Sequence, residues 1–139
     1  MRTARFIFIL IFGLCFATVQ AQTIQEQERE KNKVKLFTED EFANLHMWFY
    51  KEVQKMNLSE NADNEYSRII NHHMVKMARL DDKDVDYPKT EIIKKFNVMF
   101  DEMNAEMKPV LNKEQFDQHL EIITVLSRAI LNKLEAKEE

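Results

Sequence analysis

Methionine and histidine are the residues of this sequence that could bind a soft or borderline transition-metal ion. Met99, Met103 and Met107 recur every four residues, so a helix would place their thioethers on one side, where they could bind a soft metal ion. Such a row more often packs in a core or forms an adaptable apolar contact surface. The imidazoles that could bind zinc, nickel or copper are spread over three predicted helices, at His46, His72, His73 and His119. Because His72 and His73 point about 100° apart on a helix, the sequence favours structural roles for the histidines over a metal site.

An acidic run, DDKDVD at residues 81–86, has the beginning of a calcium-loop pattern. Counted from Asp82, acids occupy positions 1, 3 and 5. Position 6 is Tyr87, where a calcium loop needs glycine, and position 12 is Ile93, where it needs glutamate. The run is therefore predicted to be a solvated loop between helices, with Asp86 capping the helix that follows it.

Residues that support the common kinds of enzyme site are missing after the first 21 residues. Cys15 is the only cysteine and Gly13 the only glycine, so the rest of the chain has neither a thiol nucleophile nor a glycine-rich phosphate loop. Carboxylates are plentiful, but no serine, histidine and acid form a recognisable arrangement. The sequence predicts a protein that is not an enzyme and that needs no cofactor.

The first 21 residues have the pattern of a secretory signal peptide. Arg2 and Arg5 precede an apolar run over residues 6–19, and the sequence VQA at residues 19–21 is a small-residue cleavage signal. The run is shorter than the ~20 residues of a membrane-spanning helix, so we expect cleavage after Ala21, no stable membrane insertion, and a periplasmic or secreted protein. Cleavage would reduce the 20 basic residues to 18 against 24 acidic ones, and the resulting net charge of −6 argues against nucleic-acid binding.

Apolar residues recur at the helical period in four segments, whereas strand patterns are almost absent. We expect helices over residues 39–56, 62–80, 88–107 and 113–135. The predicted core stripes, in chain order, are Phe42, Leu45, Phe49, Val53 and Met56; Tyr66, Ile69, Ile70, His73, Met77 and Leu80; Ile92, Ile93, Phe96, Phe100, Met103 and Met107; and Phe116, Leu120, Ile123, Ile130 and Leu134. Residues 22–36 are polar and carry like charges at repelling spacings. They are predicted to form a flexible tail before a single helical domain at 37–139.

The last predicted helix begins with a capping box in the sequence LNKEQF. The Asn112 side chain can accept a hydrogen bond from the first turn, and Gln115 can reach back to the Asn112 backbone. Leu111 and Phe116 occupy the positions of a hydrophobic staple. Pro109 helps to end the preceding helix, so the motif marks a corner between two helices.

The first predicted helix begins in the same way, with the sequence FTEDEF. Thr38 is predicted to cap this helix, Glu41 to reciprocate, and Phe37 to staple Phe42. Because good helix starts are common in α-helical proteins, the repeat alone identifies no function.

The two helix starts are similar to the Leu-Thr-x-x-Gln (LTXXQ) motifs of the Spy/CpxP family of bacterial periplasmic proteins. The late copy, VLNKEQF, is the better match and follows a methionine-containing helix as in that family, whereas the early copy has Phe37 for leucine and Glu41 for glutamine. The signal peptide, the many methionines and the lack of cysteine in the mature chain add to a likeness that covers residues 36–135. The resemblance implies an elongated, hooked bundle of four helices that forms a cradle-shaped homodimer. It also implies an ATP-independent chaperone, a stress-response protein or a metal sensor.

Several apolar residues are predicted to form a contact surface for other proteins. Trp48 and Tyr50 lie off the stripe of the first helix, and Met47, Met74 and Met99 lie near the edges of theirs. A thin layer of four helices has little interior, so these side chains need a partner subunit or an exposed apolar surface. Basic residues that could steer unfolded chains are interspersed with them, namely Lys51, Lys55, Lys76, Arg79, Lys94 and Lys95.

We therefore expect a homodimeric chaperone or stress-response protein that binds unfolded or partner proteins. Three alternatives stay open: a metal sensor or metal-binding protein, a structural or regulatory helical protein, and a monomer whose core absorbs these apolar residues.

Overall fold

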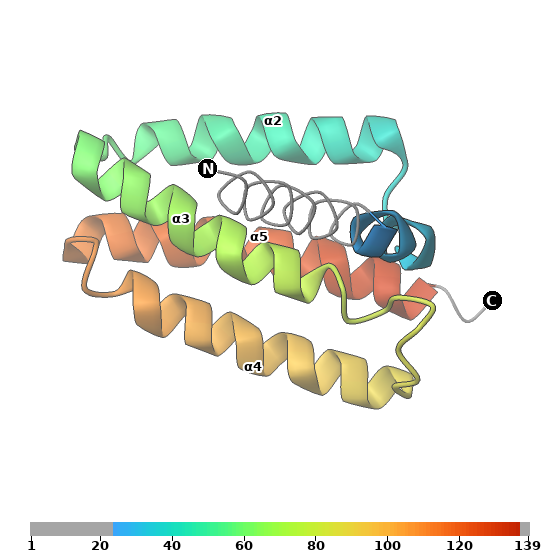
Figure 1. Cartoon of the computed structure of the whole chain (residues 1–139). Helices are drawn as coiled ribbons and strands as arrows, with labels where there is room; N and C mark the ends of the chain where they lie inside the picture. The colour runs from blue at the N-terminus through green and yellow to red at the C-terminus, as the bar shows by residue number, and fades with distance from the viewer. Residues whose placement is uncertain (1–23, 137–139) are drawn as a thin grey trace, which may run out of the picture. The chain divides into compact units, whose positions relative to one another are not determined.

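The computed structural model of the chain describes residues 24–136, which form helices and no strands. The all-α class predicted from the sequence is therefore confirmed. The helices of the bundle are α2 (Glu39–Lys55), α3 (Glu60–Met77), α4 (Lys89–Met107) and α5 (Lys113–Ala136), as labelled in Figure 1. Within residues 24–136, no helix has the length and apolar character needed to cross a membrane. The predicted signal peptide lies outside the described residues.

Residues 24–32 also form a helix, although the sequence pattern predicted a polar tail there. The prediction rested on like charges four residues apart. Opposite charges three residues apart have the contrary effect, and Glu30 and Lys33 form such an ion pair at 3.8 Å. This segment belongs to a unit that ends at Lys33, and the bundle is a second unit that begins at Val34.

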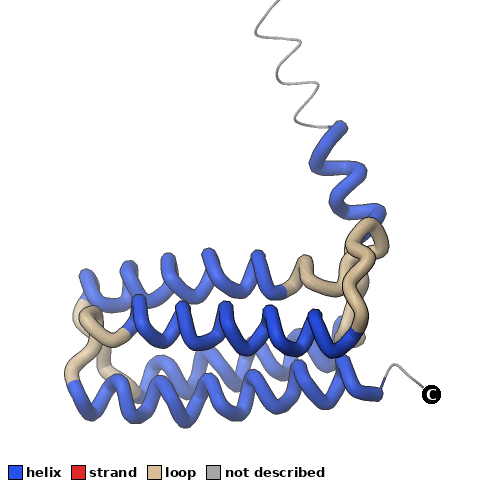
Figure 2. Tube along the Cα trace, turned by 90° about the horizontal axis from the view of Figure 1, so that it is seen from below, coloured by secondary structure: helices blue, strands red, loops and turns tan. Residues whose placement is uncertain are grey.

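The bundle is built by three pairs of neighbouring helices. α3 packs against α4, α4 against α5, and α5 against α2, and Figure 2 shows the helices running side by side. α2 and α3 are consecutive in the chain, but their backbones do not pack against each other within the described bundle. The backbone of α2 therefore lies closest to α5, the helix most distant from it in sequence.

The core is formed mainly by α3, α4 and α5. Its most deeply buried large side chains are Tyr66, Ile69, Phe96, Met103, Met107, His119 and Ile123. The methionine row of α4 belongs to this core, because Met103 and Met107 are fully buried and Met99 packs against them from its edge. Packing thus accounts for the four-residue spacing of the methionines.

The core stripe predicted for residues 62–80 is right, since its five residues in α3 and Leu80 just after that helix are all buried. The prediction is wrong at one position in each of two other helices. Phe42 of α2 is 61% exposed and stacks on His46 with ring centroids 6.2 Å apart. Val53 is the only buried residue along α2, so less of the helix's circumference is covered than a full apolar stripe occupies. Leu120 of α5 is also exposed, and the adjacent His119 is buried in its place.

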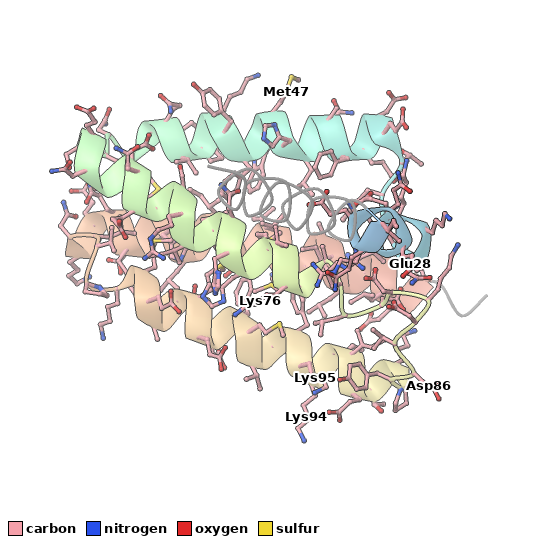
Figure 3. The ribbon with its side chains drawn as sticks, viewed as in Figure 1. Glu28, Met47, Lys76, Asp86, Lys94 and Lys95 are labelled. Atoms are coloured by element: carbon pink, nitrogen blue, oxygen red, sulfur yellow. The ribbon has the colours of Figure 1, made fainter. Side chains whose placement is uncertain are left out.

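The loop between α3 and α4 differs from its prediction at both ends. Asp82 was expected to be solvated but is buried, where it pairs with Arg79 three residues earlier. Asp86 lies exposed at the other end of the loop (Figure 3), and the residue that caps α4 is Pro88, with no side-chain capping bond. The prediction that Asp86 caps this helix is therefore wrong.

Candidate functional site

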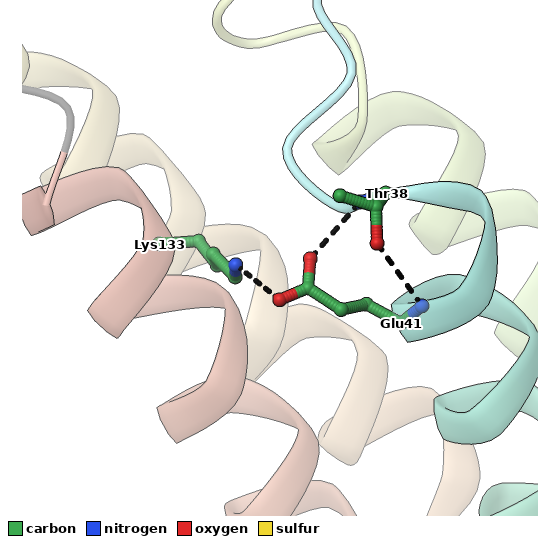
Figure 4. A network of polar contacts seen from close by, with 3 residues as sticks. All are labelled: Thr38, Glu41 and Lys133. Carbon is green, nitrogen blue, oxygen red and sulfur yellow. Dashed lines mark hydrogen bonds and ion pairs between the residues drawn. The ribbon is translucent and has the colours of Figure 1, made fainter.

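The start of α2 is held by a capping box that also reaches another helix. The Glu41 N–H donates to Thr38 Oγ1 at 3.2 Å, and the Thr38 N–H donates to Glu41 Oε2 at 3.0 Å. The second oxygen of this carboxylate, Oε1, accepts a bond of 2.6 Å from Lys133 Nζ near the end of α5 (Figure 4). The hydrogen bond from Lys133, followed by the one from the Thr38 backbone, lowers the pKa of Glu41. Glu41 thus caps its own helix and ties it to α5.

The start of α5 repeats this arrangement with neutral groups. The Gln115 N–H donates to Asn112 Oδ1 at 2.9 Å, and the Asn112 N–H donates to Gln115 Oε1 at 3.2 Å. Gln115 Nε2 then donates to the backbone oxygen of Met56, at the end of α2, at 3.2 Å. Each capping residue therefore holds the far end of the other helix. We call the two contacts, Glu41 with Lys133 and Gln115 with Met56, the α2–α5 clamp.

The staple positions behave differently in the two copies. Leu111 is buried and Phe116 is half-buried at the start of α5. Phe37 is half-buried at the start of α2, where Lys133 Nζ lies 5.8 Å from the centre of its ring. Phe42 lies outside the core, so the early copy contributes one residue to the core where the late copy contributes two.

Removing the Asn112 cap should destabilise the protein measurably. We expect Asn112→Ala to lower the free energy of unfolding by about 1 kcal/mol, because the Gln115 N–H would lose its acceptor. Asn112→Asp keeps an acceptor and should stay within a few tenths of a kcal/mol of the wild type. Urea unfolding followed by circular dichroism measures both, and equal midpoints for Asn112→Ala and the wild type would contradict the assignment.

A buried polar network joins α3, α4 and α5. Asn104 Oδ1 can only accept, so His119 Nε2–H donates to it at 3.0 Å, and His119 Nδ1 accepts from the Tyr66 hydroxyl at 3.1 Å. Burial lowers the pKa of His119 to about 4 and raises the pKa of Tyr66. His119 is therefore neutral at pH 7, with both nitrogens satisfied, and acts as a structural residue.

The other histidines do not converge on a common point. His73 is buried, with Nε2 3.2 Å from Glu106 Oε1, whereas His46 and His72 are exposed. Within residues 24–136, no three side chains of His, Cys, Asp or Glu are grouped so that they could hold a metal ion.

The apolar residues predicted to contact clients are divided between surface and core. Met47 and Tyr50 of α2 are 54% and 60% exposed, and Figure 3 shows Met47 pointing away from the bundle. Trp48, Met74 and Met99 are half-buried and pack against the core. The structure therefore leaves two of the five predicted apolar residues fully available to a partner.

The predicted basic residues are also divided. Lys51, Lys76 and Lys94 are exposed. The others have neighbours of their own: Lys55 Nζ lies 2.6 Å from Glu52, Arg79 pairs with Asp82, and Lys95 Nζ lies 3.6 Å from Glu91 and 4.7 Å from the Tyr87 ring centre. Among these basic residues, Lys51 is both exposed and next to Tyr50 in the sequence of α2.

The exposed side of α2 carries an apolar surface that the sequence pattern described only in part. Its residues, which we call the outer strip, are Phe42, Ala43, His46, Met47 and Tyr50, and all five are exposed. The spacing of Phe42, His46 and Tyr50 by four residues aligns them on a helix. No Asp, Glu, Lys or Arg occurs between residues 42 and 50. The same spacing could have identified Phe42 and His46 from the sequence, had Phe42 not been assigned to the core.

A small cavity of about 10 Å³ lies near the end of the bundle, between residues that include Leu36, Met77, Phe96 and Ile130. It has room for about one water molecule. The candidate site is the exposed outer strip of α2.

Comparisons of the chain with protein-family models, with curated proteins and with solved structures found no match.

Proposed function

We propose that this protein binds unfolded or partner polypeptides through the outer strip of α2, without ATP, in the periplasm or outside the cell. The observation that carries the proposal is the exposure of Phe42, Met47 and Tyr50, each more than half open to solvent on one helix. Apolar patches rimmed by polar residues commonly mark protein interaction sites. The location rests on the signal-peptide pattern, and the chaperone class rests on the resemblance to the Spy/CpxP family.

The chemistry of the strip suits partners of varied sequence. Met47 is unbranched and polarizable, so it can repack against different side chains. The tyrosine and phenylalanine rings supply large contact areas at a low cost in conformational entropy. Lys51 at the edge of the strip offers a positive charge to acidic groups of the partner. None of these interactions requires a nucleotide or a deep pocket.

The hooked bundle and cradle-shaped homodimer implied by the resemblance belong to the same proposal. Two copies would present two outer strips to one unfolded chain, and linked weak contacts bind far more tightly than single ones. Equilibrium sedimentation at tens of micromolar would reveal the dimer directly.

An aggregation assay tests the proposed function. The wild type should slow the aggregation of a reduced, unfolding α-lactalbumin when present in several-fold excess, with or without zinc or copper. A strip variant, Phe42→Ser with Met47→Ser and Tyr50→Ser, should lose this protection by about tenfold, because the apolar contacts are gone. Its fold should be unaffected, since all three side chains are exposed.

The matched control replaces exposed apolar residues outside the strip. Val75→Ser on α3 with Val98→Ser on α4 removes two exposed apolar side chains from other helices and should keep full protection. Equal loss in both variants would show that the strip has no special role, and a wild type without protection would contradict the function itself.

A further inference from the structure

α2 is attached to the bundle less firmly than the other helices. Along its 17 residues only Val53 is buried, whereas the 18 residues of α3 bury five side chains and the 24 residues of α5 bury six. Its other contacts with the core come from half-buried side chains, Leu45, Trp48 and Phe49. Regions with few buried apolar contacts tend to open at a lower free energy than the rest of a protein.

The three remaining helices are joined by contacts that do not involve α2. Tyr66 of α3 and Asn104 of α4 both bond to the His119 ring of α5. His73 of α3 lies against Glu106 of α4. Tyr66, His73 and His119 are buried and none of these contacts involves α2, so α3, α4 and α5 can stay together when α2 moves.

The connection from α2 to α3 can act as a hinge. It consists of residues 57–59, which follow the C-cap residue Met56, and Asn57 there has a φ of 49°, the one positive φ of a non-glycine residue in the described chain. Ser59 caps α3 by accepting a 3.3 Å bond from the Ala62 N–H. Because α3 has its own cap, its first turn does not depend on the position of α2.

The clamp fixes α2 at its two ends. Glu41 bonds to Lys133 and Met56 bonds to Gln115. On α5, Ile122 and Leu126 fall in the same row as Gln115 and Lys133, since the steps of seven, four and seven residues return to nearly one direction. Both are buried. The apolar middle of the seam between α2 and α5 thus lies between two polar contacts.

We infer that α2 is a releasable strap, which detaches from α5 as a unit about the hinge at residues 57–59 while α3, α4 and α5 stay folded. Release uncovers Ile122 and Leu126 and provides a second apolar surface, distinct from the outer strip. The inference concerns the chain alone, so it holds or fails independently of whether the strip binds polypeptides.

Hydrogen exchange of the wild type tests the strap. Amides of α2 should exchange at least about tenfold faster than the protected amides of α3, α4 and α5, because they open without global unfolding. Equal protection in all four helices would overturn the inference, since it would show a single cooperative unit.

Clamp variants test which contacts hold the strap. Lys133→Met removes the bond to Glu41 but leaves the capping box with Thr38 intact. Gln115→Glu keeps an acceptor for the Asn112 N–H but removes the donor to Met56. The double variant should speed the exchange of α2 by a further factor of about ten, with unchanged rates in α3 and α4. An equal change in every helix, or none in α2, would overturn the role of the clamp.

Trp48 gives a second, independent readout. It is the only tryptophan in the sequence and lies half-buried on α2, so quenching of its fluorescence by acrylamide should increase in the double clamp variant. Lys113→Met is the matched control, because it removes a lysine of α5 whose partner, Asp117, is on the same helix. The control should leave both exchange and quenching as in the wild type. An increase in the control equal to that in the clamp variant would contradict the assignment.

Discussion

Acidification from pH 6.5 to pH 4 should lower the free energy of unfolding by about 3 kcal/mol through His119 alone. Burial holds the pKa of His119 at about 4 in the folded protein, below its ordinary value of 6.5. Above pH 6.5 both states are neutral at this residue and the full stability is present. As the pH falls below 6.5, His119 becomes protonated in the unfolded chain but stays neutral in the folded protein, so the free energy of unfolding decreases. The decrease ends below about pH 4, where His119 is protonated in the folded protein as well.

The His119→Gln variant separates this effect from the titration of carboxylates. It should be less stable than the wild type at pH 7, since the bonds to Tyr66 and Asn104 are disturbed, but its stability should depend less on pH between 6.5 and 4. Urea unfolding at several pH values measures both slopes. Parallel slopes for the two proteins would show that His119 is not the titrating group. In the folded protein, the groups that contact the His119 ring are Tyr66 of α3, Asn104 of α4 and Phe116 of its own helix, α5.

Two phenylalanines of the predicted core stripes, Phe42 and Phe96, should differ greatly in their response to truncation. Phe96→Ala should cost about 3–5 kcal/mol, because the Phe96 ring is 1% exposed and its loss leaves a cavity in the core. Phe42→Ala should change stability by less than about 0.5 kcal/mol, since that ring is mainly in solvent. Thermal and urea unfolding measure both, and a cost for Phe42→Ala close to that for Phe96→Ala would mean that Phe42 is covered in solution.

The periodicity of apolar residues was a reliable guide where a helix is surrounded by others. The α3 stripe is right throughout, because Tyr66, His73 and their companions face a neighbour over the whole helix length. The same period failed at Phe42, since the sequence shows which residues are apolar but not how many helices will cover them. The exposure of the outer strip could therefore not be predicted from the periodicity.

Local capping chemistry was predictable, but its longer-range use was not. Thr38 with Glu41 and Asn112 with Gln115 form the expected boxes, because the residues are three apart and depend only on local geometry. The bonds to Lys133 and Met56 join residues far apart in the sequence, and only the antiparallel packing of α2 on α5 reveals them. The burial of Asp82 was missed for a different reason, since its pairing with Arg79 permits a buried position that an unpaired charge would not occupy.

The packing of α2 on α5 also sets the order in which the chain can fold. α3 and α4 are adjacent in the sequence and can pair early, whereas Glu41 and Lys133 are 92 residues apart and close the loop between them last. Until α5 is in place, Leu45, Trp48 and Phe49 have no helix to cover them, so the incompletely folded protein itself depends on whatever shields exposed apolar segments while it folds.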